Sequence, residues 1–415
     1  MLYYRPEPSS NNQFGPFTYS YCGVLVTQLP RHLWEVFSQA PVTTTYGERG
    51  SDLGLQVFQH LARSRPQENV VLSPYGVATI LGLLLQGAHG ETRKQLITAL
   101  RYKKNGPYKM LRKLHNTLTA RSNHNIVTIA NAVFSQQGFP MEEAFVLSNK
   151  ANFQCESHNL DFSDTDAAAD SVNSWVKNQT NGRIPTLVKA EMFNGALTRL
   201  VAVNAIFFKG LWKSRFQPQN TKPRTFNGGD GKAYKVPMMS QLSLFNVGIA
   251  STPQGLNYKL IELPYHGNTI SMLIVLPMEE DTPLCDIIPH ISTATVQGWT
   301  KLLHQRKVRL LFPKFTAEAE VDLRASLSAL GVKDLFDEGK ADFRHLSSEP
   351  VYVSKALQKA KIEVNESGTK AAAATAAILL ARSSPPSVIV DRPFLFLVRH
   401  HPTGTILFVG QVNQP

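Results

Sequence analysis

Apolar positions follow a helical period near the start of the chain and a strand pattern further on. Three early segments place apolar side chains three and four residues apart, the spacing of an amphipathic helix. They are residues 53–65, residues 77–85 and the stripe of Leu111, Leu114 and Leu118. Later segments are short apolar runs, which predict strands. These runs are residues 126–134, 200–208, 261–264, 270–277 and 308–312.

The last two apolar runs predict a hairpin. Residues 394–399 and 405–409 flank His401-Pro402-Thr403-Gly404, a turn-rich connection of hairpin length. Helices thus come mostly first, and strands then follow in groups without a regular strand-helix alternation. This order predicts an α+β fold with largely antiparallel sheets rather than a doubly wound parallel sheet.

The amino-acid composition and the apolar pattern divide the chain into two parts. Residues 1–50 are rich in Pro, Ser and Thr, whereas the regular pattern begins near Asp52. Length alone would allow two or three domains, but no long linker divides the later part. We expect a leader, residues 1–50, ahead of a single folded domain, residues 51–415. The leader has no clean secretory signal, because Pro30 and Arg31 interrupt its one short apolar patch.

Composition restricts the class of protein. Hydrophobic residues make up 43% of the chain, which excludes disorder as a whole. The chain carries 43 Lys and Arg against 31 Asp and Glu, a formal charge of +12 that favours a negatively charged partner. Its 3 cysteines cannot form a disulfide framework and do not decide the redox compartment. No apolar run reaches the length of about 18 residues that a membrane span needs.

No catalytic or cofactor motif is present in the sequence. A glycine-rich phosphate loop, a serine between glycines and a His-Glu-x-x-His zinc pattern are all missing. His400 and His401 are adjacent, and neighbouring residues of a strand point to opposite faces, which disfavours a shared metal ion. We therefore disfavour a hydrolase and expect neither a metal site nor a cofactor.

Residues 362–386 have the most unusual composition in the chain. By itself this alanine-rich run is typical of a short helix or a flexible tether. It lies, however, between two strand-like segments, residues 360–364 and 388–390, so it must bridge two parts of one core. Read at the two-residue period of a strand, one face has small side chains. That face is Thr369, Ala371, Ala373, Thr375, Ala377 and Leu379.

Such a run has the properties of a strand that can enter an existing sheet. It contains no proline before Pro385, so no backbone N–H is missing, and Gly368 supplies a hinge with few limits on its backbone angles. The bond between Arg382 and Ser383 then follows. Trypsin-like proteases cut after arginine because an acid in their specificity pocket pairs with the guanidinium group.

Several longer motifs resemble the serpin family. They are NAIFFKGLW at residues 204–212, EVNESGT at 363–369, DRPFLF at 391–396 and FVG at 408–410. The resemblance runs from about residue 52 to residue 415. It implies three β-sheets with about nine helices, an exposed reactive-centre loop and a monomeric inhibitor.

The family mechanism assigns roles to the loop. The resemblance implies that a serine protease attacks Arg382, that the Arg382–Ser383 bond is cut, and that the freed loop inserts into the main sheet. The hinge of that loop would be Gly368, Thr369, Ala371, Ala373 and Thr375. The targets that the resemblance implies are the trypsin-like enzymes thrombin, plasmin, trypsin and the urokinase and tissue plasminogen activators.

The resemblance also places a polar cluster under the main sheet. Ser73, Asn204 and Gln358 would belong to it, and Trp212 would sit where the loop enters the sheet. Many serpins have a histidine where this chain has Gln358 and a serine where it has Gly76. Lys370 stands where inhibitory serpins often carry an acid, but it lies on the outward face. These departures concern opening of the sheet more than family membership.

The positive charge gathers in one predicted helix. Lys109, Arg112 and Lys113 lie opposite the leucine stripe at a spacing of three and four residues, with Lys103, Lys104 and Arg121 nearby. A solvated helix face is one interpretation. The branch of the family that the chain most resembles binds heparin through this helix, which favours heparin or heparan sulfate as an activator. Nucleic acid is not expected, because no aromatic residues interleave the basic ones.

Two glycan acceptor sequences are present. Asn178 starts one and Asn365 the other; the related branch has the first, whereas a glycan on Asn365 would obstruct the hinge. The resemblance implies a secreted, extracellular glycoprotein. The alternative is a non-inhibitory serpin, a carrier or chaperone whose loop is only a protease-sensitive tether.

Overall fold

The computed structural model describes residues 45–103, 106–123, 125–368 and 385–415. Several predicted site residues lie outside these ranges. They are Thr369, Ala371, Ala373, Thr375, Arg382, Ser383 and Lys104. The leader is also outside, apart from its last few residues.

The described residues contain eight α-helices and five short 3-10 helices. The α-helices are α1 (Tyr46–Ser64), α2 (Pro74–Gly87), α3 (Gly90–Leu100), α4 (Tyr108–Thr119), α5 (Glu143–Phe153), α6 (Thr165–Gln179), α7 (Thr293–Leu302) and α8 (Arg324–Ala329). The 3-10 helices are η2 (Ala190–Met192), η3 (Pro218–Asn220), η4 (Leu284–Asp286), η5 (Ile288–His290) and η6 (Asp334–Phe336). None of these helices combines the length and hydrophobicity that crossing a bilayer requires.

Helix α1 begins before its apolar pattern does. Its N-cap is Thr45, whose side chain accepts a hydrogen bond from the Glu48 backbone, while the Glu48 carboxylate accepts one from the Thr45 backbone. This reciprocal capping box satisfies two backbone donors that a helix start leaves open. The first turn of the folded domain therefore lies within the last residues of the predicted leader.

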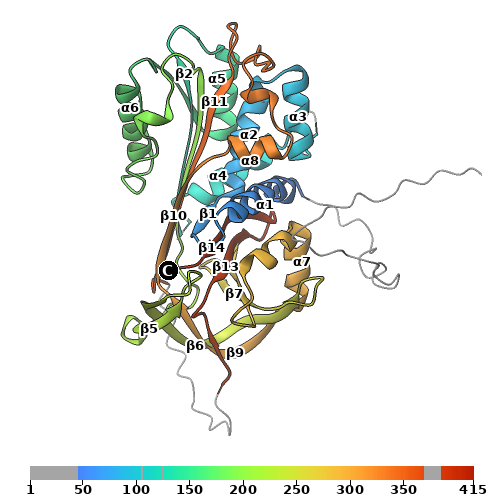
Figure 1. The fold of residues 1–415 in the computed structure, drawn as a ribbon, viewed down its shortest axis with the longest axis vertical. Helices are drawn as coiled ribbons and strands as arrows, with labels where there is room; N and C mark the ends of the chain where they lie inside the picture. Colours follow the sequence, from blue (N-terminus) through green and yellow to red (C-terminus); the bar gives the residue numbers. More distant parts are fainter. Residues whose placement is uncertain (1–44, 104–105, 124, 369–384) are drawn as a thin grey trace, which may run out of the picture. The chain divides into compact units, whose positions relative to one another are not determined.

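A five-stranded sheet crosses the upper part of the molecule in Figure 1. Its order is β10 (Phe315–Asp322), β11 (Val353–Val364), β4 (Leu200–Lys209), β2 (Ile126–Gln136) and β3 (Cys155–Leu160). Strands β11 and β4 are parallel neighbours, as are β2 and β3, and the other pairs are antiparallel. Helix α6 covers one face and α2 lies on the other (Figure 1).

Strand β4 is covered on both faces. Val203 and Phe207 pack in a cluster with α6, whereas the alternate residues Ala202 and Ile206 belong to the main core with α2. A strand buried on both sides reads as a continuous apolar run. This is why the sequence predicts β4 with nearly correct ends.

The remaining strands form one nine-stranded sheet. Along its path lie β1 (Val70–Leu72), β14 (Thr405–Val412), β13 (Phe394–His400), β8 (Ile270–Pro277), β7 (Asn257–Pro264), β6 (Ala233–Ser251), β9 (His304–Pro313) and β12 (Ser387–Ile389), and β5 (Lys222–Asn227) pairs with β6. The predicted hairpin is confirmed as β13 and β14.

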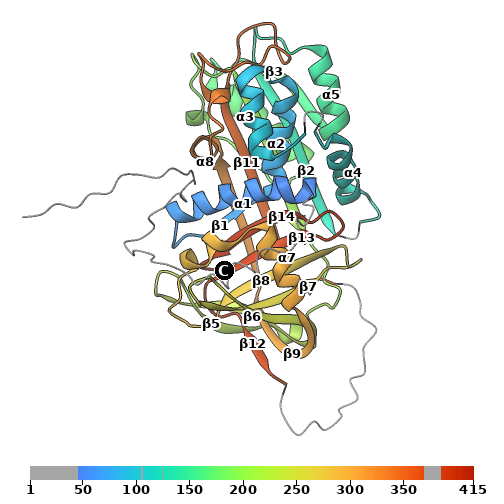
Figure 2. The same cartoon turned by 90° about the vertical axis from the view of Figure 1, so that its right-hand side faces the viewer.

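The predicted α+β class is confirmed, although the described strands pair into two sheets where three were expected. The long strand β6 is the reason. It pairs with β5 and β9 over its first part and with β7 over its last residues, so two of the expected sheets are continuous through it. Figures 1 and 2 show β5, β6 and β9 together at the lower end of the molecule.

Candidate functional site

The seam between β4 and β11 leads directly to the predicted hinge. The two strands pair in parallel from Leu200 opposite Val353 to Lys209 opposite Glu363. The chain leaves the end of β11 at Val364 and reaches Gly368, the last described residue before the predicted loop. We call this pair of strands the β4–β11 seam.

Trp212 holds the chain where it leaves the seam. Its indole Nε1 donates a hydrogen bond of 2.7 Å to the Asn365 carbonyl, and its backbone N–H donates one of 3.0 Å to the Ser367 carbonyl. The ring is buried and stacks on Tyr265, with ring centroids 4.4 Å apart and planes within 9°. The residue expected where the loop enters the sheet thus lies against the hinge segment.

Gly368 lies too close to its neighbours for a larger residue. A Cβ atom there would be 2.6 Å from the Arg215 Cβ and 2.7 Å from the Trp212 carbonyl oxygen. Trp212 also forms a parallel bridge with Gly368. The glycine is therefore required by close packing as well as by any hinge motion.

Glu366 ties the same segment to two other parts of the fold. Its carboxylate lies 3.0 Å from the Lys314 ammonium and accepts a hydrogen bond of 2.9 Å from the Thr221 hydroxyl. Burial alone would raise the pKa of this carboxyl, but hydrogen bonds from its own backbone, Lys314 and Thr221 together lower the pKa below its ordinary value. We call Trp212, Glu366, Lys314 and Thr221 the hinge anchor.

The polar cluster expected under the main sheet exists as a connected network. Gln358 and Asn204 are directly opposite each other in the seam, and the Gln358 Nε2 donates to the Asn204 Oδ1 at 3.3 Å. Gln358 also donates to the Ser73 carbonyl at 3.0 Å and accepts from the Ser73 N–H at 2.7 Å. The Asn204 amide donates in turn to Asn131 Oδ1 at 2.8 Å. We call these four residues the amide cluster.

The amide cluster is buried and closely fitted. Ser73, Asn204 and Gln358 are each exposed by 1% or less. A Cβ atom at Gly76 would lie 2.1 Å from the Asn204 Oδ1 and 2.4 Å from the Gln358 Nε2. The two departures from the common family pattern, Gln358 and Gly76, therefore fit together, because the long amide side chain occupies the space that a side chain at Gly76 would need.

Asn131 was missed by the sequence analysis, although a signal existed. It is a polar residue within the apolar run of β2, and it stands opposite Asn204 in the register of β2 and β4. Its amide donates to the Phe153 carbonyl at 2.9 Å, so it is satisfied inside the core. Lys314 and Thr221 were missed as well, because nothing in their local sequence relates them to Glu366.

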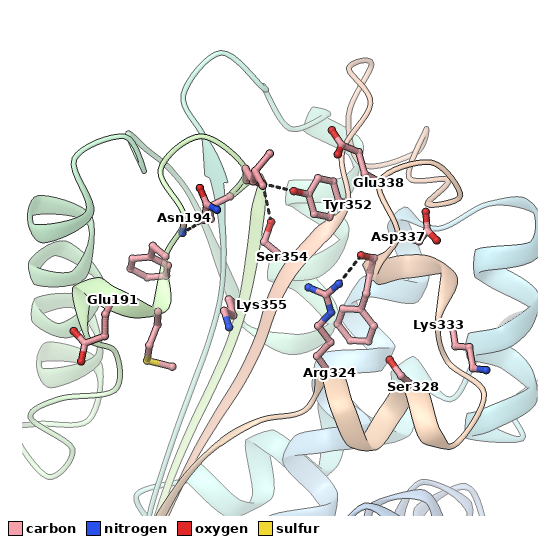
Figure 3. A pocket seen from close by; sticks show the side chains of 15 residues that line it. Glu191, Asn194, Arg324, Ser328, Lys333, Asp337, Glu338, Tyr352, Ser354 and Lys355 are labelled. Carbon is pink, nitrogen blue, oxygen red and sulfur yellow. Dashed lines mark hydrogen bonds between the residues drawn. The ribbon is translucent and has the colours of Figure 1, made fainter.

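A cavity of about 690 Å³ lies at the opposite end of the seam from the hinge. Asn194, Thr198 and Leu197 line one side, before β4, and Tyr352 and Ser354 line the other, at the start of β11. Figure 3 shows dashed lines that join Tyr352 and Ser354 to the loop before β4, where both hydroxyls meet one backbone carbonyl. That carbonyl is Leu197, which accepts from both hydroxyls.

The described cations of the predicted heparin site are all exposed. Leu111, Leu114 and Leu118 are buried as the helical stripe predicted, so the opposite face of α4 points to solvent. The exposed cations are Lys103, Lys109, Arg112, Lys113 and Arg121. None of these five forms an ion pair with another described residue. Three of them, Lys109, Arg112 and Lys113, line a shallow hollow of about 520 Å³ with Asn116 and Thr117.

Other predicted residues have simpler surroundings. Asn178 is exposed in the last turn of α6. His400 is bonded to the Thr403 hydroxyl at 2.8 Å, and burial lowers its pKa to about 4. His401 instead lies 3.6 Å from Glu262. The two histidines thus contact different partners, and His401 lies in the turn after β13 rather than on the strand as the sequence analysis assumed.

Comparison with known proteins places the chain in a family. A family model described as serpin (serine protease inhibitor) matches residues 48–415. Glia-derived nexin of Mus musculus is 56% identical over 369 residues, covering 89% of this chain and 93% of the relative. Plasminogen activator inhibitor 1 of Neovison vison is 41% identical over 387 residues, covering 92% and 96%.

Solved structures agree with the sequence relatives. Native protease nexin-1 with heparin superposes with a TM-score of 0.85 at 52% identity, covering 89% of this chain and 99% of that one. Uncleaved ovalbumin superposes with a TM-score of 0.83 at 28% identity, covering 89% and 100%. The chain therefore belongs to the serpin family and is a serine protease inhibitor, not an enzyme.

Proposed function

We propose that this serpin traps trypsin-like serine proteases by a suicide reaction at the Arg382–Ser383 bond. The serine Oγ of the protease attacks the Arg382 carbonyl carbon, the C–N bond to Ser383 breaks, and the protease histidine passes the serine's proton to the released amine of Ser383. The protease is then held as an ester on Arg382. The loop, free at that end, inserts from Gly368 into the β4–β11 seam.

The parallel pairing of β4 and β11 is the observation that carries this proposal. The chain leaves the end of β11 at the hinge anchor, so a segment that folds back from Gly368 between the two strands runs antiparallel to both. One parallel ladder is then replaced by two antiparallel ladders, which are slightly more stable for each residue. One additional ladder of about ten hydrogen bonds at about 1 kcal/mol each supplies on the order of 10 kcal/mol.

The amide cluster acts as the gate of this insertion. Its bond between Gln358 and Asn204 joins the two strands that must separate. Both amides are buried, so each needs a new partner as the seam opens. The inserted backbone supplies donors and acceptors at that position, and the gate therefore resists opening until a strand arrives to fill it.

The loop is long enough to bring the ester on Arg382 to the far end of the seam when it inserts. Gly368 and Arg382 are fourteen positions apart in the sequence, whereas β4 spans 10 residues. The end of the inserted segment therefore approaches the cavity near Tyr352 and Leu197. A protease attached to Arg382 is drawn to the end of the molecule opposite the hinge and is pressed against it.

Heparin or heparan sulfate serves as activator through α4. One solved relative is a protease nexin-1 with heparin, and Lys109, Arg112 and Lys113 line one shallow hollow on the exposed face of α4. A sulfated polymer held there also binds a basic protease and raises the local concentration of the pair. The proposal includes secretion as a monomer with a glycan on Asn178, and targets among thrombin, plasmin, trypsin and the two plasminogen activators.

The inhibitory reaction is tested by mixing the protein with thrombin and separating the products on a denaturing gel. We expect a covalent band near the sum of the two masses and a fragment released from the carboxyl side of Arg382. Arg382→Ala should abolish the band with thrombin. Cleavage at Arg382 without a covalent band, and without a rise in melting temperature after cleavage, would instead identify the carrier or chaperone alternative.

The activator site is tested by neutralising Lys109, Arg112 and Lys113 together. We expect heparin to lose most of its acceleration of thrombin inhibition, while the rate without heparin is unchanged. The matched control removes three exposed lysines from other helices, Lys150, Lys177 and Lys301. An equal loss in both triple variants would contradict a specific site on α4.

A further inference from the structure

Another hollow lies among the helices in the upper part of Figure 2. Its volume is about 950 Å³, and α2, α3, α4 and α5 each contribute to its walls. The loop at residues 342–345 supplies Arg344 and His345 to the same walls. We call it the helical hollow. It includes no residue of the β4–β11 seam and none of the predicted heparin residues.

Most of the ionisable side chains that line the helical hollow are basic. Arginine is always charged, and histidine gains a proton between about pH 7 and about pH 5. The rings of His89 and His345 meet edge to face, with centroids 5.1 Å apart. Burial raises the pKa of Tyr108, so its phenol stays neutral and can donate a hydrogen bond. The ionisable residues of the lining are His89, Arg93, Tyr108, Glu142, Arg344 and His345.

Asp342 fixes two of the basic groups in place. Its carboxylate accepts hydrogen bonds of 2.9 Å and 2.8 Å from the Arg344 guanidinium, and it lies 3.4 Å from the His89 Nδ1. The bonds from Arg344 lower the pKa of Asp342, so this carboxylate is ionised when the histidines gain charge. The His89 N–H also donates to the Asp342 carbonyl at 2.9 Å. These basic groups are therefore positioned before a ligand arrives, which lowers the entropic cost of binding.

The charge of the helical hollow changes with pH. At neutral pH, Arg93 and Arg344 are accompanied by two carboxylates, Glu142 in the lining and Asp342 beside it. Among the described residues, no other Asp or Glu lines the hollow. Each histidine that gains a proton therefore adds a positive charge that no acid offsets. In mild acid the hollow has an excess of positive charge, which matches an anion with several oxygen atoms.

The helical hollow borders the predicted heparin site. Tyr108 is the first residue of α4 and lines the helical hollow, whereas the next residue, Lys109, lines the shallow hollow of the cationic face. Neighbouring Cα atoms are about 3.8 Å apart, so both hollows begin at the first turn of α4. A sulfated polymer on α4 can therefore place a sulfate group in the helical hollow. A free phosphate compound supplies the same oxyanion chemistry.

We propose that the helical hollow is an oxyanion site, which binds a sulfate or phosphate group and binds it more tightly in mild acid. Arg344, His89 and His345 pair with the negative charge, and the Tyr108 hydroxyl donates to one of the anion's oxygens. Glu142 repels the anion and keeps its affinity low at neutral pH. The site is separate from the cations of α4 and from the reactive bond, so it does not depend on the proposed inhibitory reaction.

The test compares two variants of the hollow with matched controls. It uses the full chain with the three α4 cations of the activator test neutralised, so that their face does not mask binding in the hollow. One variant combines His89→Gln with His345→Gln, and the other is Glu142→Gln. The controls are His304→Gln, at an exposed histidine of β9, and Glu191→Gln, at an exposed glutamate of η2. Neither control residue lines the hollow.

The measurement is titration calorimetry with sucrose octasulfate, whose charge is the same at pH 7.5 and pH 5.5, at one ionic strength. We expect binding to be roughly tenfold tighter at the lower pH, because the histidines gain charge in this interval. The histidine variant should lose this pH dependence. Glu142→Gln should bind more tightly already at pH 7.5, a gain that damage to the fold would not produce. Both controls should bind like the background protein.

A heparin octasaccharide, titrated into the protein with α4 unaltered, then distinguishes the sources of the anion. Weaker octasaccharide binding in the histidine variant at pH 5.5 shows that the polysaccharide reaches the hollow. A loss confined to sucrose octasulfate assigns the hollow to a free sulfate or phosphate compound. Absence of octasulfate binding at pH 5.5, or an equal loss in His304→Gln, overturns the oxyanion site. Heparin acceleration judges the α4 site separately, so either site can fail alone.

Discussion

The middle of the β4–β11 seam and its hinge end are closed by different means. The middle is held by the amide cluster, in which neutral residues with almost no exposure form hydrogen bonds with one another. The hinge end is held by the buried Trp212 and by the partly exposed ion pair of Lys314 and Glu366. The middle therefore stays closed through the close fit of its buried amide side chains. The hinge end stays closed through one large buried ring and one ion pair.

This difference suits the two tasks that the proposed loop insertion requires. In that proposal the middle stays shut until a strand arrives, and a close-packed polar network resists any partial opening because each buried group would lose its partner. The hinge end, in the same proposal, releases the first residues of the loop. An ion pair with a side chain as exposed as Lys314, 46%, is a weaker contact that solvent can replace.

The largest expected effect is at Trp212. Replacing it with alanine should lower the free energy of unfolding by about 3–5 kcal/mol, because a buried ring stacked on Tyr265 is lost. Chemical denaturation measures this value. Trp299→Ala is the matched control, since both indoles are 2% exposed. Only the Trp212 variant should also consume more inhibitor for each protease trapped; equal behaviour of the two would contradict a hinge role.

The next effect is at Gly76, in the middle of the seam. Gly76→Ala should destabilise the protein by about 1–3 kcal/mol, because its Cβ would collide with the amides of Asn204 and Gln358. Gly298→Ala in α7 is the control, since no atom lies within 4 Å of its added Cβ. That substitution should instead stabilise the protein by about 0.5–1 kcal/mol. An unchanged free energy of unfolding in Gly76→Ala would mean that the amide cluster can rearrange without cost.

A smaller effect is expected at the ion pair of the hinge end. Glu366→Gln and Lys314→Met should each cost about 1 kcal/mol. A double-mutant cycle should give a favourable coupling energy, because each charge is the other's partner at 3.0 Å. Purely additive effects of the two substitutions would show that Glu366 acts through Thr221 alone.

The smallest effect is a pH dependence that only the hinge end should have. The pKa of Glu366 is lowered in the folded protein, so its contribution is present above the ordinary value of 4.5 and is lost as the pH falls through the lower folded value. Unfolding measured between pH 6 and pH 3 should therefore lose less stability in Glu366→Gln than in the unaltered protein. If both proteins lose the same stability over this pH range, ionisation of Glu366 does not contribute to the stability of the hinge end.

Much of the fold could be predicted because its signals are local. The apolar run of β4 was found to within one residue of its ends, and the hairpin of β13 and β14 was found with its turn in place but with β14 ending three residues early, since a buried strand shows in a few consecutive residues. Strand β6 was missed, because its exposed and buried positions mix polar and apolar residues without strict alternation. The start of α1 was placed late, because its first turn is polar and depends on the cap at Thr45.

The candidate site divides in the same way. The cationic face of α4 follows from helical spacing alone, and its described cations are exposed as that spacing predicts. The roles of Asn131 and Lys314 could not be found from the sequence. Each acts on a residue far away in the chain, and no local pattern records such a contact.

The sequence by itself determined the properties that a short segment carries. These are the small residues after Gly368, the arginine before Ser383 and the cations at helical spacing. Only the tertiary structure decided which segments meet. It set Gln358 opposite Asn204, and Leu242 and Ser387 on either side of Arg309. The physical reason is that strand register and order are fixed by packing of the whole sheet, whereas helical spacing and backbone freedom are properties of neighbouring residues.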